Sequence, residues 1–286
     1  MRSPPPLGPS IFARWTSRIA LFSVGLLAIA LLLHRLVSLP TTIALNLVAV
    51  AFAGAALSIL LAIAAAVGVW RTGRPGTSRI VFGTVVSLGI LLWPLVFLPS
   101  YHRLPKLNDV TTDTSNPPAF VSLARLRGPG ANPVAYAGGK FATAQHEAYP
   151  DIKPIEINRS VDEAYELAAD AIRRLKMEIV SQAPPDLETG RPGTLEAVDR
   201  TLILGFYDDV AIRVLGDEEQ ARIDVRSASR FGRHDLGRNA ERVRQILKEV
   251  VVRMESVVPA VRTKAEKPKV VKEERRRNRR SRRRRR

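Results

Sequence analysis

Three long apolar stretches occupy the first hundred residues of the chain. Residues 80–98 contain 19 uncharged positions, enough for a helix that crosses a hydrocarbon core of about 30 Å. Residues 43–70 contain 28 uncharged positions and would have to tilt. Residues 19–33 contain only 15, so this stretch spans a membrane only if the helix continues to Val37. The pattern predicts three transmembrane helices, at about 16–37, 43–70 and 80–98.

The first stretch has an alternative interpretation as a signal peptide. Arg14 and Arg18 resemble the basic region that precedes the apolar core of such a peptide. The run of Leu, His and Arg at 31–35 offers no small-residue cleavage site, however. We therefore favour a helix that is retained in the mature protein.

The sidedness of the chain follows from the Lys and Arg residues beside the predicted spans. Six lie in the N-terminal segment and the second loop, and three lie in the first loop and after the third span. The richer side consists of Arg2, Arg14, Arg18, Arg71, Arg74 and Arg79. Because cytoplasmic loops carry the excess of positive charge, residues 1–15 are predicted to be cytoplasmic. The remainder of the chain would then lie outside the cytoplasm, at the inner (plasma) membrane.

Residues 99–152 interrupt any regular pattern. Pro117 and Pro118, the 128–130 Gly-Pro-Gly run and the paired glycines at 138–139 are typical of loops. We expect a Pro/Gly-rich tether between the membrane and the next folded unit.

Regular periodicity begins at residue 153. A short strand candidate at 153–158 precedes a capping box at Ser160–Glu163 and helical spacing to Leu175. Short strand patterns follow, with a hairpin turn at 216–219. The last pattern is a helical stripe, formed by Ala240, Val243, Leu247, Val250, Met254 and Val257. Residues 153–260 therefore predict a small two-layer α+β domain, an antiparallel sheet packed by two helices.

Charge divides along the chain in the same way as hydropathy. The formal net charge is +17, but residues 109–261 carry 24 acidic and 20 basic residues. The tail, 261–286, has ten Arg in its last twelve positions and is predicted to be disordered in isolation. The chain has no Cys, which excludes disulfides, a thiolate nucleophile and a Cys-ligated zinc site.

Four motifs, in order, resemble a known family. They are the 107–113 segment followed by Pro117 and Pro118, then 205–213, 224–230 and 235–240. Residues 107–259 resemble the domain of unknown function numbered fourteen-ninety-nine, which occurs in bacterial envelope proteins and plant plastid proteins. The resemblance implies a domain identity and no mechanism. The Arg-rich tail is not part of the family pattern.

The strongest candidate site is a charged strand face. Residues two apart on a strand point the same way, so Arg213, Asp224 and Arg226 share one side. Two hairpin registers are open: Asp209 opposite Arg226, or Arg213 opposite Asp224. The face is interpreted either as structural ion pairs or as an anion-binding pocket. In the pocket, Arg226 and Arg230 would be the donors, and Ser227 and Ser229 would assist them. The candidate residues are Asp209, Arg213, Asp224, Arg226, Ser227, Ser229 and Arg230.

Other combinations of residues carry weaker signals. Asp208 and Asp209, with His234 and Asp235, lack the spacing of a metal site, because neighbouring strand residues point apart. We expect a bulge or turn at Asp208, and an N-cap or turn residue at Asp235. No motif for a nucleotide, a hydrolytic nucleophile or a catalytic zinc is present, so no cofactor and no metal are predicted.

Two functional hypotheses remain open. The first is a non-enzymatic envelope protein whose extracytoplasmic domain binds a ligand or partner. Besides membrane lipid, an anionic envelope component or a protein would be its partner. The second is a cytoplasm-facing anchor that binds nucleic acid or ribosomes through the Arg tail. No aromatic residue is interleaved in the tail, so base stacking is unsupported there.

Overall fold

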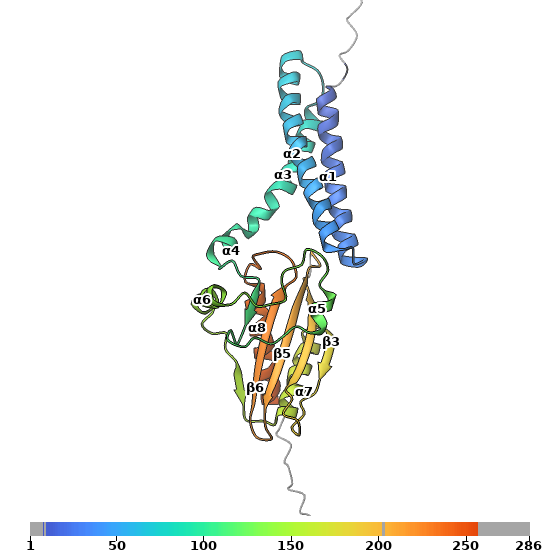
Figure 1. The fold of residues 1–286 in the computed structure, drawn as a ribbon. Helices are drawn as coiled ribbons and strands as arrows, with labels where there is room; N and C mark the ends of the chain where they lie inside the picture. The colour runs from blue at the N-terminus through green and yellow to red at the C-terminus, as the bar shows by residue number, and fades with distance from the viewer. Residues whose placement is uncertain (1–7, 9, 202–203, 257–286) are drawn as a thin grey trace, which may run out of the picture.

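The computed structural model describes residues 8, 10–201 and 204–256. Its first part holds three helices that are long and apolar enough to cross a membrane. Helix α1 (Ile11–Leu36) and helix α2 (Thr41–Thr72) run side by side in opposite directions (Figure 1). The third candidate span covers Thr77–Arg103. This arrangement confirms the three apolar helices, with ends one to five residues from those predicted.

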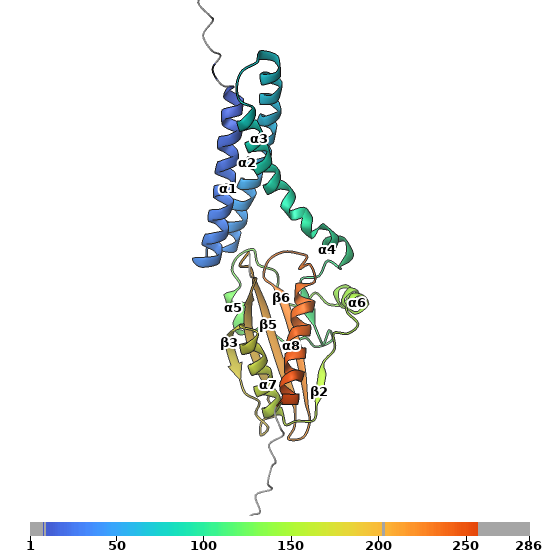
Figure 2. The same cartoon turned by 180° about the vertical axis from the view of Figure 1, so that it is seen from behind.

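The third span changes its helical form at Pro94. Helix α3 (Thr77–Leu92) passes into the 3-10 helix η1 (Trp93–Phe97) and then into helix α4 (Leu98–Arg103). Proline lacks the N–H that an α-helix interior needs, and short 3-10 turns accommodate such interruptions. From this point α4 diverges from α1 and α2, which leaves its apolar flank open (Figures 1 and 2).

Small residues bring the three helices together. Ala13, Ala20, Ala51 and Ala55 are fully buried between them. At Gly83 a Cβ would lie 3.0 Å from the backbone of Thr16, so only glycine permits this approach. The sequence predicted this role for the alanine-rich second stretch.

Within the described residues, six strands form one antiparallel sheet in the order β1-β6-β5-β4-β3, with β2 also paired to β6. The strands are β1 (Asp109–Thr111), β2 (Ile155–Ile157), β3 (Glu178–Ala183), β4 (Gly193–Arg200), β5 (Tyr207–Gly216) and β6 (Ala221–Ser229). The β5–β6 hairpin turns at 217–220, where the Asp217 carboxylate accepts hydrogen bonds from two backbone N–H groups. The predicted hairpin and fold class are confirmed.

Two helices cover one face of this sheet, as Figure 2 shows. Helix α7 (Val161–Arg174) starts at Ser160, whose hydroxyl accepts from the Glu163 N–H at 3.3 Å. Helix α8 (Arg238–Ser256) buries Ala240, Val243, Ile246 and Val250 completely. Leu247 and Met254 pack at the edge of the core, and Val257 lies outside the described residues. The alternation of the strands and the helical stripe thus form one core between the two layers.

The segment predicted to be a tether is part of the domain, which corrects that expectation. Residues 99–103 end the third span as part of α4, and residues 109–111 form β1, which pairs with β6. Helix α5 (Ser122–Leu126) and helix α6 (Gly139–Ala148) follow. Phe120 and Leu123 pack on Val198, Ala211 and Ala228, on the sheet face opposite α7 and α8. Residues 112–136, which we call the covering segment, are therefore ordered, and their prolines and glycines mark turns. Apolar residues are too sparse there for a periodic pattern, so the sequence did not reveal this role.

A fragment that begins at Lys153 is therefore expected not to fold. It would lack β1 and the covering segment, and it would expose Val198, Ala211 and Ala228 together with buried charges. A fragment of residues 105–256 should be soluble and show cooperative urea unfolding, followed by circular dichroism. Equal stability of the two fragments would show that residues 107–152 contribute nothing to the fold.

The end of α1 holds the domain against the three-helix bundle. His34 is buried, with Nδ1 2.7 Å from the Leu204 carbonyl oxygen and Nε2 3.0 Å from the Thr41 hydroxyl. Arg200 donates to the His34 carbonyl oxygen. Because a carbonyl only accepts, Nδ1 must carry the proton in this arrangement. The sequence showed no partner for His34, since its contacts with the domain lie about 170 residues away along the chain.

Candidate functional site

The register of the β5–β6 hairpin decides which charges face one another. Arg213 lies opposite Asp224, and Asp209 lies opposite Ala228. The second of the two predicted registers is therefore confirmed, and the one that placed Asp209 opposite Arg226 is wrong. The Arg213 guanidinium lies 2.8 Å from the Asp224 carboxylate, and Arg222 reaches the other oxygen of that carboxylate at 3.1 Å.

A buried ion pair joins β6 to β1. Arg226 donates through Nε and Nη2 to both carboxylate oxygens of Asp109, at 3.0 and 2.6 Å. The same guanidinium donates to the carbonyl oxygens of Pro118 and Val134. All three nitrogens are therefore satisfied by groups from the covering segment and β1. A bidentate pair of this kind fixes geometry as well as charge.

Aromatic rings enclose this pair. The Arg226 guanidinium lies 4.4 Å from the ring centre of Phe120 and 5.8 Å from that of Tyr136. Burial raises the pKa of Tyr136 to about 12, and the Asp109 charge adds to the shift. Burial also raises the pKa of Asp109, although Arg226 opposes the shift. The desolvation penalty of the carboxylate is thus only partly offset by its partner.

Asp209 forms a second buried group on the same face. Arg127 donates from Nε to one carboxylate oxygen and Arg230 donates from Nε to the other, each at 2.8 Å. Asp209 is completely buried, and both arginines are largely so. We call Asp109, Arg127, Asp209, Arg226 and Arg230 the outer charged cluster. Arg127 belongs to the covering segment and carried no signal in the sequence, since loops have no period that reveals burial.

Ser227 and Ser229 lie on the other side of the sheet, which corrects the expectation that they assist Arg226 and Arg230. Ser227 donates to the Asn239 side chain at 2.8 Å and accepts from Arg242 at 3.0 Å. Ser229 accepts from the Asn239 amide at 3.0 Å. Neighbouring strand residues alternate between faces, so these hydroxyls meet the first turns of α8.

Arg242 is the centre of this inner polar group. Its guanidinium lies 2.7 Å from both Asp199 and Asp208. Burial alone would lower the pKa of Arg242, but the two carboxylates raise it above its usual value. Asp208 is paired regularly with Ser229 in the ladder, so the bulge or turn expected there is absent. Asp208 and Asp209 do point to opposite faces, as the strand geometry predicted.

Asp235 lies at the start of α8. Its carboxylate accepts from the backbone N–H groups of Gly237 and Asn239, at 2.8 and 2.9 Å. This confirms the expected turn or capping role. Burial raises the pKa of Asp235 despite these hydrogen bonds. Within the described residues, no group of three or more His, Asp and Glu side chains has the geometry of a metal site.

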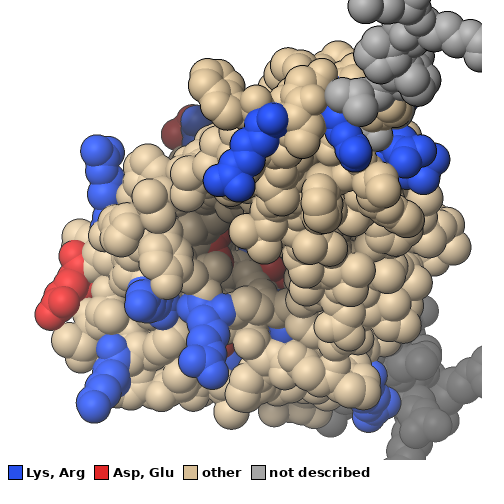
Figure 3. Space-filling model, turned by 90° about the horizontal axis from the view of Figure 1, so that it is seen from above, with Lys and Arg blue, Asp and Glu red and all other residues tan. Residues whose placement is uncertain are grey.

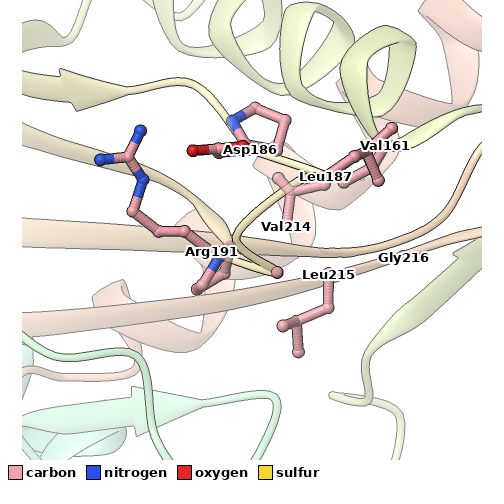
Figure 4. Close-up of a pocket in the computed structure, with 10 residues that line it drawn as sticks. Val161, Asp186, Leu187, Arg191, Val214, Leu215 and Gly216 are labelled. Carbon is pink, nitrogen blue, oxygen red and sulfur yellow. The ribbon is translucent and has the colours of Figure 1, made fainter.

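A shallow pocket lies at the end of the domain farthest from the bundle. It is lined by residues of the β3–β4 connection and of the end of β5, with Val161 of α7 beside them (Figure 4). Its volume is about 70 Å³. Sites for small organic ligands usually measure about 300–1,000 Å³. This pocket is therefore suited to one side chain of a partner, and not to a whole substrate molecule.

The predicted site residues thus fall into two internal networks. Arg226 and Arg230 are paired with carboxylates and covered by residues 112–136, so the geometry favours the structural ion-pair interpretation of this face. Such buried networks add specificity to a fold, since an alternative packing would leave charges unpaired. An unpaired nucleophile or base beside an open cleft is not part of either network.

Comparison with known proteins supplies a family. A model described as a protein of unknown function, DUF1499, matches residues 109–250. The match confirms the resemblance seen in the sequence motifs and falls within the range predicted for it. It also begins at β1, in agreement with the covering segment being part of the domain. No curated protein matches the chain.

Proposed function

We propose a role for this chain, which belongs to the DUF1499 family of proteins of unknown function through residues 109–250. It is a non-enzymatic protein of the cell envelope that is anchored in the plasma membrane, and its extracytoplasmic domain binds a partner. The observation that carries the proposal is that the domain is fixed to the ends of its own membrane helices. The contacts of His34 with Leu204 and of Tyr101 with His234 hold it there. A domain held in this way presents its far end to the space beside the membrane.

The chemistry of the domain supports binding over catalysis. Its buried carboxylates are occupied by arginines and backbone N–H groups, and burial of this kind stabilises one conformation. The far end is different. There Leu187 and Leu215 are exposed at the small pocket, which Asp186 and Arg191 also line. An apolar spot with charges of both signs beside it fits a protein segment that inserts one apolar side chain and pairs its polar groups at the rim.

The sidedness can be tested directly because the chain contains no cysteine. Ser115 of the domain and Ser78 at the start of α3 are both exposed. Single Ser115→Cys and Ser78→Cys proteins should be treated with a membrane-impermeant maleimide in cells stripped of any outer barrier. We expect labelling of Ser115→Cys at once, and of Ser78→Cys only after lysis.

The reverse labelling pattern would contradict the proposal. The domain and the Arg-rich tail would then share the cytoplasm, and the second hypothesis, an anchor for nucleic acid or ribosomes, would replace the first. That hypothesis rests on the composition of the tail, which lies outside the described residues.

A further inference from the structure

Positive charge gathers at the end of the domain that faces the bundle. Arg103, Lys106, Arg233 and Arg238 are exposed there. We call these four residues the membrane-facing cations. In the segments that carry them, 101–108 and 230–238, the single acid is Asp235, which is buried and bound to two backbone N–H groups. The view from the bundle end shows several Lys and Arg side chains, with few Asp or Glu side chains among them (Figure 3).

The membrane-facing cations lack acidic partners in the described part of the chain. None of the four forms an ion pair there. This contrasts with Arg213, Arg226, Arg230 and Arg242, which are all bound by carboxylates. Their charge is therefore available to a ligand.

Contacts between α4 and the turn before α8 bring these cations into one place. The rings of Tyr101 and His234 stack with centres 5.0 Å apart, and Asn108 donates to the Gly232 carbonyl oxygen at 2.9 Å. Leu104 packs so close to Gly237 that a Cβ there would lie 2.9 Å from it, and the φ of Gly237 is +80°. Arg233 and Arg238 flank this fixed turn, and Arg103 and Lys106 flank the segment that it contacts.

An apolar surface runs directly into the same place. Leu95, Val96, Leu98 and Tyr101 of η1 and α4 are exposed, with Val96 at 76%. They belong to the part of the third span that diverges from α1 and α2 (Figures 1 and 2). Apolar side chains that continue into unpaired cations match a molecule with an acyl chain and an anionic head.

We propose that the membrane-facing cations and the open flank of η1 and α4 bind an anionic phospholipid, with its headgroup at Arg103, Lys106, Arg233 and Arg238. The position argues for a lipid over an acidic protein, since the ends of membrane helices are surrounded by lipid headgroups. The proposal does not depend on the side of the membrane on which the domain lies. It also explains how Arg233 and Arg238, which are far from the spans along the chain, act at the bilayer surface only after the domain has folded.

The test uses Trp93, at the start of η1, as a local reporter. The chain has three tryptophans, so Trp15→Phe and Trp70→Phe leave Trp93 alone. The full-length protein would be reconstituted in phosphatidylcholine bilayers, and quenching of Trp93 by brominated phosphatidylglycerol compared with quenching by brominated phosphatidylcholine. A cation near an anionic surface strengthens binding by about fivefold. We therefore expect a preference for phosphatidylglycerol of at least about tenfold from several cations together.

Matched variants separate the site from overall charge. The ratio of Trp93 quenching by brominated phosphatidylglycerol to quenching by brominated phosphatidylcholine should fall close to one in a triple variant, Arg103→Gln, Arg233→Gln and Arg238→Gln. The control variant, Arg71→Gln, Arg74→Gln and Arg79→Gln, removes the same charge from the exposed end of α2, the turn and the start of α3, at the other end of the bundle. It should preserve the preference for phosphatidylglycerol. Circular dichroism would verify that both proteins are folded. The tail is present in every protein compared.

Any of three results would overturn the proposal. The first is a parent protein that shows no preference for phosphatidylglycerol. The second is a triple variant at 103, 233 and 238 that retains the preference, and the third is an equal loss of the preference in both triple variants. If the variant at 103, 233 and 238 retains the preference, the Arg-rich tail attracts the lipid, or the four cations bind an acidic protein instead. An equal loss would show that net charge, and not this arrangement, draws the lipid.

Discussion

Replacing Arg226 with Gln is expected to lower the free energy of unfolding of the domain by about 3–5 kcal/mol. The side chains of Arg226 and Asp109 are 4% and 9% exposed. Loss of the guanidinium would leave the Asp109 carboxylate buried without its partner, and the carbonyls of Pro118 and Val134 without their donor. Urea unfolding of the 105–256 fragment measures the effect.

Arg222→Gln is the matched control. Arg222 stands on the same strand and the same face, but its side chain is 40% exposed, and Asp224 keeps its contact with Arg213. We expect a loss of at most about 1 kcal/mol for this change. Similar losses for both variants would contradict the view that burial makes the Asp109–Arg226 pair indispensable.

The Arg226→Gln protein should also respond to pH in a defined direction. Burial already raises the pKa of Asp109, and removal of Arg226 takes away the main group that opposes this shift. The folded variant then binds a proton more tightly than the unfolded chain, whose carboxyl has a pKa of about 3.9. Its deficit relative to the parent should shrink as the pH falls from about 7 toward about 4. A deficit independent of pH would show that Asp109 is hydrated once Arg226 is gone.

Val250→Asp is expected to abolish cooperative folding of the domain. Val250 is completely buried on α8, within the core between α8 and the sheet. A carboxylate there has no partner, so it costs several kcal/mol or remains protonated. Thermal melting of the 105–256 fragment, followed by circular dichroism, should lose its transition or shift by tens of degrees.

Val252→Asp provides the control on the same helix. Val252 is 46% exposed, two positions along and on the solvent side. The chemical change is identical, so the helix propensity and the added charge are the same in both proteins. We expect Val252→Asp to melt within a few degrees of the parent. Equal melting of the two variants would disprove the packing of α8.

The buried, paired charges of the domain are more readily explained by specificity of the fold than by a gain in stability. The outer charged cluster joins β1, β5, β6 and the covering segment through salt bridges that only one arrangement satisfies. The Glu196 carboxylate acts in the same way, accepting from the backbone N–H groups of Val121, Ser122 and Leu123. These contacts position a segment that has too few apolar residues to position itself.

Several features of this protein follow from the sequence alone. The three apolar stretches predict α1, α2 and the third span, because only length and hydropathy are needed to identify a helix that can cross a bilayer. The stripe of α8 and the alternation of β5 and β6 are equally local, since a helix or strand buried on one face repeats its apolar residues at its own period. The capping role of Ser160 is readable for the same reason: its partner is three residues away.

Only the tertiary structure decided the features whose partners are distant. Asp109 meets Arg226 117 residues further along the chain, and His34 meets Leu204 at a separation of 170. A period along the sequence reports burial of one face, but it contains no information on which segment covers the other face. For that reason residues 99–152 are expected from the sequence to be a tether. The two serines are a different case, since alternation along β6 already separates Ser227 and Ser229 from Arg226. What only the tertiary structure decided is their partner, Asn239 of α8, because the sequence does not show which helix covers that face.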